Sequence, residues 1–338
     1  MRKNLCLRQL ILAVLICLLA CTCLAAGLAE SGDAEEPEYW GIIGKRMNVH
    51  RKGNADSSVL GGIEKGTVVD VYSKGRNWTK IAYGNGTGYV QTKFIEMVQR
   101  KNPFDGPMPG TSNHVAVAYV QQNTSFLPPG FRYPVKVSAG TWLSVHNILD
   151  GKITFPYRRL TNDVVMSSQN MEIIPFVPWN VAQPGDLLYA FSTFFSTSAN
   201  KEGNIGRLYN IDLASQRLTN IIVKPDEVFS FNAICGPYTP ENGYQPAPIL
   251  SGESSMGFGG GVCQVCSTIY NIVLRVPTVI LDMNWHSQAG TSYLPSGFDA
   301  TVSNTKDMQF KNILPYAIRI EFESLNGVMT AFFYRADS

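Results

Sequence analysis

The residue with the clearest chemical potential is Cys263, which follows a run of three glycines at positions 259–261. Glycine accepts positive φ angles and lets another group approach the backbone closely. The residues after it predict a helix over 261–275, which ends before Pro277. A thiol in the first turn of a helix feels the positive end of the helix dipole, which favours the thiolate. Cys263 is therefore the candidate nucleophile of this chain.

A second cysteine, Cys266, lies three residues further along the predicted helix. A helical wheel places Cys266 within an apolar stripe and Cys263 at the edge of that stripe, on the side of Ser267 and Tyr270. Because a buried cysteine commonly acts as a small hydrophobic residue, Cys266 is predicted to lie in the core. The pair forms a C-x-x-C motif, but no thioredoxin-like βαβ pattern surrounds it, which disfavours a redox role. A P-loop is also excluded, since Lys and Ser or Thr do not follow the glycines.

The composition describes an ordinary globular protein. The chain has 338 residues, of which 45% are hydrophobic and 16% are charged, enough for two or three domains. Its formal net charge of +2 includes Arg2, Lys3 and Arg8, and removing them leaves 25 basic residues against 26 acidic ones. No basic stripe is present, so no nucleic-acid partner is predicted. With four histidines and no His/Cys cluster, neither a metal site nor a cofactor is predicted.

Residues 1–29 have the layout of a secretory signal, with a basic start, an apolar stretch and small residues at its end. They predict a signal peptide or an N-terminal membrane anchor, since about 20 apolar residues can cross a bilayer. Leu18-Leu19-Ala20-Cys21 also resembles a bacterial lipobox, which would place a lipid on Cys21. Each alternative exports the protein to the extracellular side or the cell envelope. The three cysteines that remain in the body argue against a disulfide scaffold.

Residues 39–99 alternate short β-rich runs with Gly/Asn turns, which predicts a small barrel with strands over 46–50, 66–72, 78–83 and 87–90. At Met47-Asn48-Val49-His50, Gly66-Thr67-Val68, Trp78-Thr79-Lys80-Ile81 and Gly88-Tyr89-Val90 the segment resembles the bacterial SH3-like domain. The resemblance implies a module that binds the cell wall or a peptide. Trp78 and Tyr89 are the candidate binding residues, although such aromatics also fill the cores of small domains. A fainter sequence similarity to this segment predicts a possible second, diverged SH3-like barrel over 112–180.

The last part of the chain, residues 187–335, mixes helical and strand-like patterns. The predicted elements are a helix over 204–214 and strands over 226–232, 278–283, 300–302, 318–322 and 329–334. At the following segments this part resembles the VanW family, named after an accessory protein of vancomycin-resistance clusters: 226–232, 241–244, 259–265, 267–271, 286–287, 293–297 and 299–302. Cys266 departs from the family pattern, where serine is usual. The predicted architecture is α+β, with small SH3-like β-barrels followed by a mixed α+β VanW domain.

Two further residues complete a candidate catalytic set with Cys263. His286 and Asp299 follow it at intervals of 23 and 13 residues, within segments that carry the resemblance. A nucleophilic thiol needs a base within hydrogen-bond reach, and the base needs an orienting carboxylate. A cysteine that opens a helix, followed by a histidine and an aspartate on later strands, is also the layout of transglutaminase-like and papain-like enzymes. The predicted binding and oxyanion-stabilising residues beside this set are Gln264, Gly260, Gly261, Tyr270 and the amide of Cys263.

Two functions stay open from the sequence. In the first, the VanW domain is a cysteine-dependent hydrolase or acyltransferase that acts on peptidoglycan stem peptides. In the second, it binds a wall peptide or a glycopeptide without catalysis, His286 is structural, and Cys263 packs under the glycine turn. Peptidoglycan or its stem peptides are the expected partner in both, and the membrane is met only through the N-terminal segment.

Overall fold

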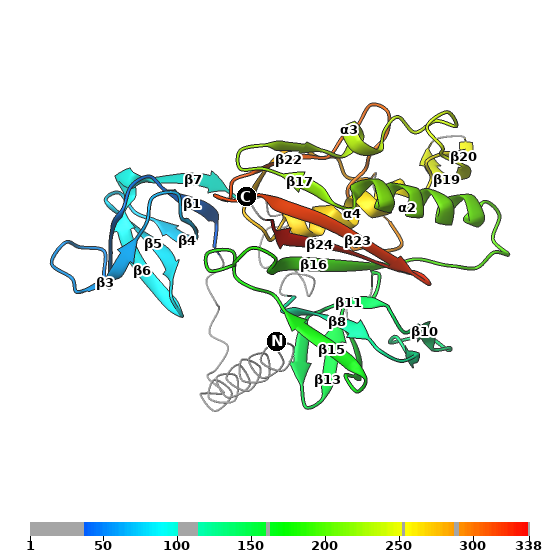
Figure 1. The fold of residues 1–338 in the computed structure, drawn as a ribbon, viewed down its shortest axis with the longest axis horizontal. Helices are drawn as coiled ribbons and strands as arrows, with labels where there is room; N and C mark the ends of the chain where they lie inside the picture. Colours follow the sequence, from blue (N-terminus) through cyan, green and yellow to red (C-terminus); the bar gives the residue numbers. More distant parts are fainter. Residues whose placement is uncertain (1–36, 101–113, 160–162, 252–253, 287–290, 337–338) are drawn as a thin grey trace, which may run out of the picture. The chain divides into compact units, whose positions relative to one another are not determined.

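The computed structural model describes residues 37–100, 114–159, 163–251, 254–286 and 291–336 (Figure 1). The predicted leader at 1–29, with Cys21, lies outside the described residues. From Pro37 onward the chain forms one compact unit. Among the residues described, no helix has the length and apolar character needed to cross a membrane.

The N-terminal part of the described chain is an antiparallel sheet in the order β3-β2-β6-β5-β4-β1-β7. The elements are β1 (Tyr39–Ile43), β2 (Met47–His50), β3 (Val59–Ile63), β4 (Val68–Lys74), β5 (Trp78–Tyr83), β6 (Gly86–Gln91), η1 (Thr92–Phe94) and β7 (Ile95–Gln99). Strands β2, β4, β5 and β6 lie where the β-rich runs predicted them. Alternate residues of β4, such as Val69 and Val71, enter the core with Ile81 and Val90. Because β3 and β7 are edges that do not pair, the predicted closed barrel is wrong and the sheet is open.

The middle part, residues 114–175, forms three small sheets. They are built from β8 (Ala116–Val120), β9 (Thr124–Phe126), β10 (Val135–Val137), β11 (Trp142–Val145), β12 (Asn147–Leu149), β13 (Lys152–Phe155), β14 (Val164–Ser167) and β15 (Met171–Pro175). The sheet orders are β10-β9, β11-β8-β15 and β12-β13-β14. None of these sheets closes into a barrel, because their strands pair in separate groups. A relation of 112–180 to a second SH3-like unit stays a prediction.

The C-terminal part combines a four-stranded antiparallel sheet, β16-β24-β23-β17, with a three-stranded sheet, β18-β22-β21, and a β-hairpin, β19-β20. The strands are β16 (Leu187–Phe194), β17 (Ile221–Val223), β18 (Val228–Ser230), β19 (Pro246–Ser251), β20 (Ser254–Phe258), β21 (Thr278–Asp282), β22 (Gln309–Asn312), β23 (Ile318–Leu325) and β24 (Val328–Arg335). The helices are α2 (Asn204–Leu218), α3 (Phe231–Cys235) and α4 (Val262–Val273). This is an α+β arrangement, as predicted.

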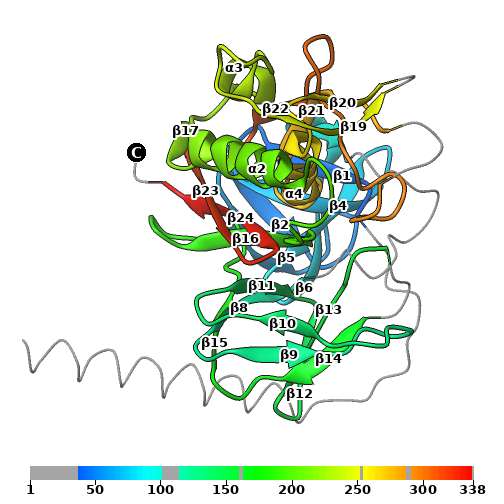
Figure 2. The same ribbon diagram turned by 90° about the vertical axis from the view of Figure 1, so that its right-hand side faces the viewer.

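Helices α2 and α4 cover one face of the four-stranded sheet (Figures 1 and 2). Helix α4 packs on β16 and β24, and α2 packs on β23 and on α4. On the other face, β11 contacts β16 and β24, and the buried Val117 of β8 packs with Leu187, Ala190 and Phe332. The sheet is therefore covered on both faces, which explains why every residue of β16 is buried.

The structure confirms the helix predicted over 261–275, which is α4, and the strands predicted over 278–283, 318–322 and 329–334. One strand prediction is correct only in part, and another fails. The run at 226–232 contains only the short β18, because Ser230 caps α3 by accepting a hydrogen bond from the amide of Ala233 (3.0 Å). Residues 300–302 form no strand, because Ala300 pairs with a helix side chain instead of a neighbouring strand.

Candidate active site

The glycine turn before α4 is shaped by its packing against α2. Gly259 and Gly261 have φ angles of +79° and +106°, which favour glycine. A Cβ atom at Gly261 would lie 2.9 Å from Cγ of Arg207 and 3.0 Å from Cγ1 of Ile211. The turn thus needs glycine both for its conformation and for the close approach of α2. It brings Cys263 into the first turn of α4, next to α2.

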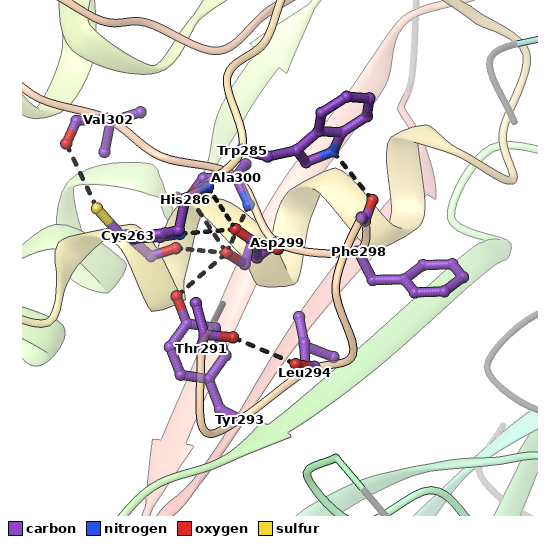
Figure 3. Close-up of polar contacts among 12 residues, drawn as sticks. Cys263, Trp285, His286, Thr291, Tyr293, Leu294, Phe298, Asp299, Ala300 and Val302 are labelled. Atoms are coloured by element: carbon purple, nitrogen blue, oxygen red, sulfur yellow. Dashed lines mark hydrogen bonds and ion pairs between the residues drawn. The ribbon is translucent and has the colours of Figure 1, made fainter. Parts of the chain in front are cut away.

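The three cysteines of the described chain have different surroundings. Cys235 and Cys266 are fully buried, whereas Cys263 is half-buried. Burial raises the pKa of Cys235 to about 12 and that of Cys266 well above its usual value. The structure therefore confirms Cys266 as a core residue. The Cys263 thiol donates a hydrogen bond to the carbonyl oxygen of Val302, with an Sγ–O distance of 3.4 Å (Figure 3).

His286 and Asp299 form a close pair beside Cys263 (Figure 3). Nδ1 of His286 lies 2.7 Å from Oδ2 of Asp299, and the His286 amide donates to the same oxygen at 2.8 Å. Their side chains are only 10% and 2% exposed. Burial lowers the pKa of His286, but hydrogen bonds with Asp299 and with the Cys263 sulfur outweigh it and raise the pKa to about 9. Burial raises the pKa of Asp299, but the hydrogen bonds from His286 leave it below the usual value.

Neither His286 nor Asp299 lies on a strand, in contrast to the prediction. His286 follows β21, and Asp299 lies in the loop after Pro295. That loop is fastened to α4 by two polar side chains of the helix. Ser267 Oγ accepts from the Ala300 amide at 2.9 Å, and Asn271 Nδ2 donates to the Phe298 carbonyl at 2.7 Å. These bonds hold the backbone on both sides of Asp299, so the helix that carries the thiol also positions the carboxylate.

This loop also corrects the helical wheel. The wheel placed Ser267 and Tyr270 on the same edge as Cys263, but both are fully buried because the loop covers that edge. Tyr270 was predicted to bind substrate, yet none of its side chain is exposed. Along the helix edge that the wheel predicted to be accessible, only the first turn reaches the surface.

The Gln264 side chain forms hydrogen bonds to other residues of the protein. Its Nε2 donates to Oγ1 of Thr193 at 3.1 Å and to the Phe194 carbonyl at 3.2 Å. Its Oε1 accepts from Nη2 of Arg207 at 2.6 Å. Both amide hydrogens are therefore used, and the side chain has none left for an oxyanion. Gln264 fixes α4 to β16 and α2.

The backbone amides of the first helical turn differ in how they are satisfied. The amides of Val262 and Gln264 donate to the carbonyls of Gly259 and Gly261, at 3.1 and 3.0 Å. First-turn amides have no acceptor within a helix, and that of Cys263 makes no such turn bond with any residue described. It is the amide best placed to stabilise an oxyanion formed at Cys263. Gly260 serves the turn, because a Cβ there would lie 2.5 Å from the Pro248 carbonyl oxygen.

Three residues near Cys263 were not predicted from the sequence. Arg207 of α2 packs over the glycine turn, and Tyr293 lies within 3.4 Å of Ser267 through its hydroxyl group. Arg158 comes from the middle part of the chain. Burial lowers the pKa of Arg207, which has Tyr293, Arg158 and Cys263 as ionisable neighbours, and burial raises the pKa of Tyr293, which the neighbouring Cys263 raises further. The sequence around Arg207 and Tyr293 does not mark either residue as part of a site. Only the fold brings them together.

Trp78 and Tyr89 lie on β5 and β6 of the N-terminal sheet, on neighbouring strands. Both are half-buried and neither belongs to the core of that sheet. The Trp78 ring lies 4.9 Å from the ring of His50, edge to face. Tyr83, by contrast, packs against the core. Among the described residues, no group of three or more His, Cys, Asp or Glu side chains could hold a metal ion.

Comparisons with known proteins identify two domains. The family described as "VanW like protein" matches residues 206–334, and the family "Bacterial SH3 domain" matches residues 45–96. A relative from Bacillus subtilis (strain 168), "Uncharacterized protein YoaR", is 38% identical over 149 residues, which are 44% of this chain and 47% of that protein. "Vancomycin B-type resistance protein VanW" of Enterococcus faecalis is 26% identical over 102 residues, 29% of this chain and 37% of that protein. The chain thus spans less than half the length of these relatives.

A solved structure, "Structure of NlpC1 from Trichomonas vaginalis", aligns over 92% of this chain and 97% of that chain, with 10% sequence identity and a TM-score of 0.19. That TM-score is too low to support a fold assignment. The family matches agree with the sequence resemblances at both ends of the chain. This chain therefore carries a VanW-like domain at residues 206–334 behind a bacterial SH3 domain at residues 45–96.

Proposed function

We propose that the VanW-like domain is a cysteine-dependent hydrolase or acyltransferase that acts on peptides of the bacterial cell wall. The observation that carries the proposal is the environment of His286. Asp299 holds Nδ1 of the imidazole, and the Cys263 sulfur lies close enough to raise the pKa of His286. A protonated imidazole beside the sulfur favours the thiolate, which is the nucleophilic form of cysteine.

In the proposed reaction, the Cys263 thiolate attacks a peptide carbonyl carbon. The carbonyl oxygen becomes an oxyanion, which the Cys263 amide stabilises. His286 donates its proton to the leaving amine, the C–N bond breaks, and an acyl thioester forms. Water, or the amine of a second peptide, then attacks the thioester carbonyl and gives a proton to His286, and the thiolate leaves. Asp299 keeps the imidazole oriented in both steps.

The cell wall as the site of action is supported by the domain composition. A bacterial SH3 domain fits a wall-associated protein, and one relative of the VanW-like domain carries the name of a vancomycin-resistance protein. The half-exposed Trp78 and Tyr89 are the proposed contacts of the SH3 domain with peptidoglycan. Export through the N-terminal segment, to the envelope or outside the cell, is part of the proposal.

One contact favours a second candidate, in which the domain binds a wall peptide without catalysis. The Cys263 thiol already has a hydrogen-bond acceptor, the Val302 carbonyl. A cysteine satisfied in this way also suits a structural position under the glycine turn. This alternative predicts saturable binding of muropeptides that persists in the Cys263→Ser variant, without any product.

The test is incubation of the full chain with defined muropeptides, followed by mass spectrometry. We expect products with the wild type and none with Cys263→Ala. Cys266→Ser is the matched control, because it removes a buried thiol on the same helix and should leave the products unchanged. Products formed by Cys263→Ala would contradict the proposal. Saturable binding without product in the wild type would support the non-catalytic alternative.

A further inference from the structure

Two arginines near Cys263 lack acidic partners. Arg207 and Arg158 are both half-buried, and among the described residues neither lies within ion-pair distance of an Asp or Glu side chain. The nearby Asp299 is already paired with His286. Burying part of a guanidinium group without a counter-ion is unfavourable. Among the described residues, no Asp or Glu side chain neutralises this positive charge.

A chain of contacts fixes the place of Arg207. Its stem packs against Gly261, the residue that caps α4, and its Nη2 donates to Oε1 of Gln264 at 2.6 Å. This is the one hydrogen bond that its guanidinium makes with the described residues. A guanidinium has five N–H donors in a planar fork. Most of the donors of Arg207 are therefore left for a ligand beside the first turn of α4.

Arg158 comes from the middle part of the chain, and its charge lies close enough to Arg207 to lower the pKa of that guanidinium. It follows Tyr157, whose ring lies 4.8 Å from that of Phe194, and the Phe194 carbonyl accepts from Gln264. The guanidinium of Arg158 lies 5.4 Å from the centre of the Tyr157 ring. Its buried Nε has no hydrogen-bond partner among the residues described. The residue adopts a φ of +57°, an uncommon backbone conformation for a side chain of this kind.

We propose that Arg207 and Arg158 form a carboxylate-binding subsite beside Cys263, so that the domain selects peptides that end in a free carboxylate near the reacting acyl group. A carboxylate fits because its two oxygens match the planar fork of a guanidinium, and because it relieves the repulsion between two like charges. Since Arg158 lies outside the VanW-like match at 206–334, the middle part of the chain contributes to specificity. The inference rests on the proposed function, because it names the substrate class of the same site.

The test measures binding rather than turnover, with the full chain carrying Cys263→Ala. The probes are N-acetyl-L-Lys-D-Ala, a stem-peptide fragment with one carboxylate, and the same peptide with a C-terminal carboxamide. NMR titration gives both dissociation constants. We expect the acid to bind at least about tenfold more tightly than the amide, as a charge-assisted hydrogen-bond pair provides. The preference should fall as the salt concentration rises.

Variants at the two arginines then test which of them causes the preference for the acid over the amide. Arg207→Gln should reduce the acid-to-amide ratio to about 1, Arg158→Gln should reduce it partly, and Arg207→Lys should give an intermediate ratio, since charge remains without the fork. Arg132→Gln, at an exposed arginine of the middle part, is the matched control and should leave the ratio unchanged. The ratio compares two ligands on one sample, so a partly unfolded variant does not imitate the effect.

Equal binding of acid and amide, a ratio that survives Arg207→Gln, or no binding of either peptide would overturn the inference. Its failure is distinguishable from failure of the proposed function. If the wild type forms products but binds both peptides alike, the reaction stands and the subsite is wrong. If the preference depends on Arg207 but the wild type forms no product, the subsite stands and the catalytic proposal is wrong.

Discussion

Two His–Asp pairs in this chain have nearly the same geometry and different surroundings. In the VanW-like domain, Nδ1 of His286 lies 2.7 Å from Asp299, and the side chains are 10% and 2% exposed. In the middle part, Nδ1 of His146 lies 2.5 Å from Asp163, with side chains that are 24% and 28% exposed. A His–Asp contact alone therefore does not mark a catalytic site. The difference lies in burial and in the second group that acts on the imidazole.

The Cys263 sulfur is close enough to His286 to raise its pKa, whereas the ring of His146 lies 6.0 Å from that of His114. Among the described residues, no cysteine forms a hydrogen bond with His146. The comparison teaches that an acid–base role needs a buried, oriented imidazole and a reacting group within reach. The first two predictions below pair a change at the first site with the equivalent change at the second.

The largest expected effect is that of removing the imidazole. His286→Ala should reduce the rate of muropeptide conversion by at least about 100-fold, because it removes the general acid and base. His146→Ala should leave the rate within about twofold. Liquid chromatography of the products measures both. An equal loss in the two variants would break the comparison, since it would mean that both histidines act only through the stability of the fold.

Asp299→Asn should have the next largest effect. The variant keeps the size of the side chain but removes the charge that orients His286, so conversion should fall strongly, though less than in His286→Ala. The free energy of unfolding should fall by about 1–3 kcal/mol, because a buried charged hydrogen bond is lost. For the more exposed pair, Asp163→Asn should lower the free energy of unfolding by less than about 1 kcal/mol and leave conversion unchanged. Urea denaturation measures the change in the free energy of unfolding, and the product assay measures conversion.

The pH dependence of stability should also report the charge on His286. The folded pKa of His286, about 9, lies above the unfolded value of about 6.5. Its protonated form therefore stabilises the fold fully below pH ~6.5, and this contribution disappears as the pH rises through 9. The stability advantage of the wild type over His286→Ala should shrink between pH 6.5 and 9.5, by on the order of 1–3 kcal/mol. A constant difference across this range, measured by urea denaturation, would contradict the proposed charge on His286.

The sequence predicted the reacting groups better than it predicted their support. The order of Cys263, His286 and Asp299 identified residues that the fold does bring together, because their types carry the chemistry. The role of Ser267 was missed, since a helical wheel shows one helix and cannot show a loop that covers it. The same limit made Tyr270 look accessible. Residues 300–302 were predicted as a strand, because the apolar pattern of a buried loop held by helix side chains resembles that of a strand.

The proposed contribution of Arg207 and Arg158 could not be predicted, because they are separated by 49 positions in the chain and only the fold brings their charges close. The closed barrels failed for a related reason. Even spacing of short strands predicts their number, but the pairing of the first and last strands depends on contacts that are distant in the sequence.

The central claim, that His286 and Asp299 activate Cys263, is tested most directly by the rate at which iodoacetamide alkylates this thiol at pH 6, measured by intact-protein mass spectrometry on the full chain. The Cys266→Ser background removes the neighbouring thiol from the measurement. We predict that Cys263 is alkylated readily in this background and at least about tenfold more slowly when His286→Ala is added, because the imidazolium that favours the thiolate is lost. An unchanged rate in His286→Ala would contradict the account.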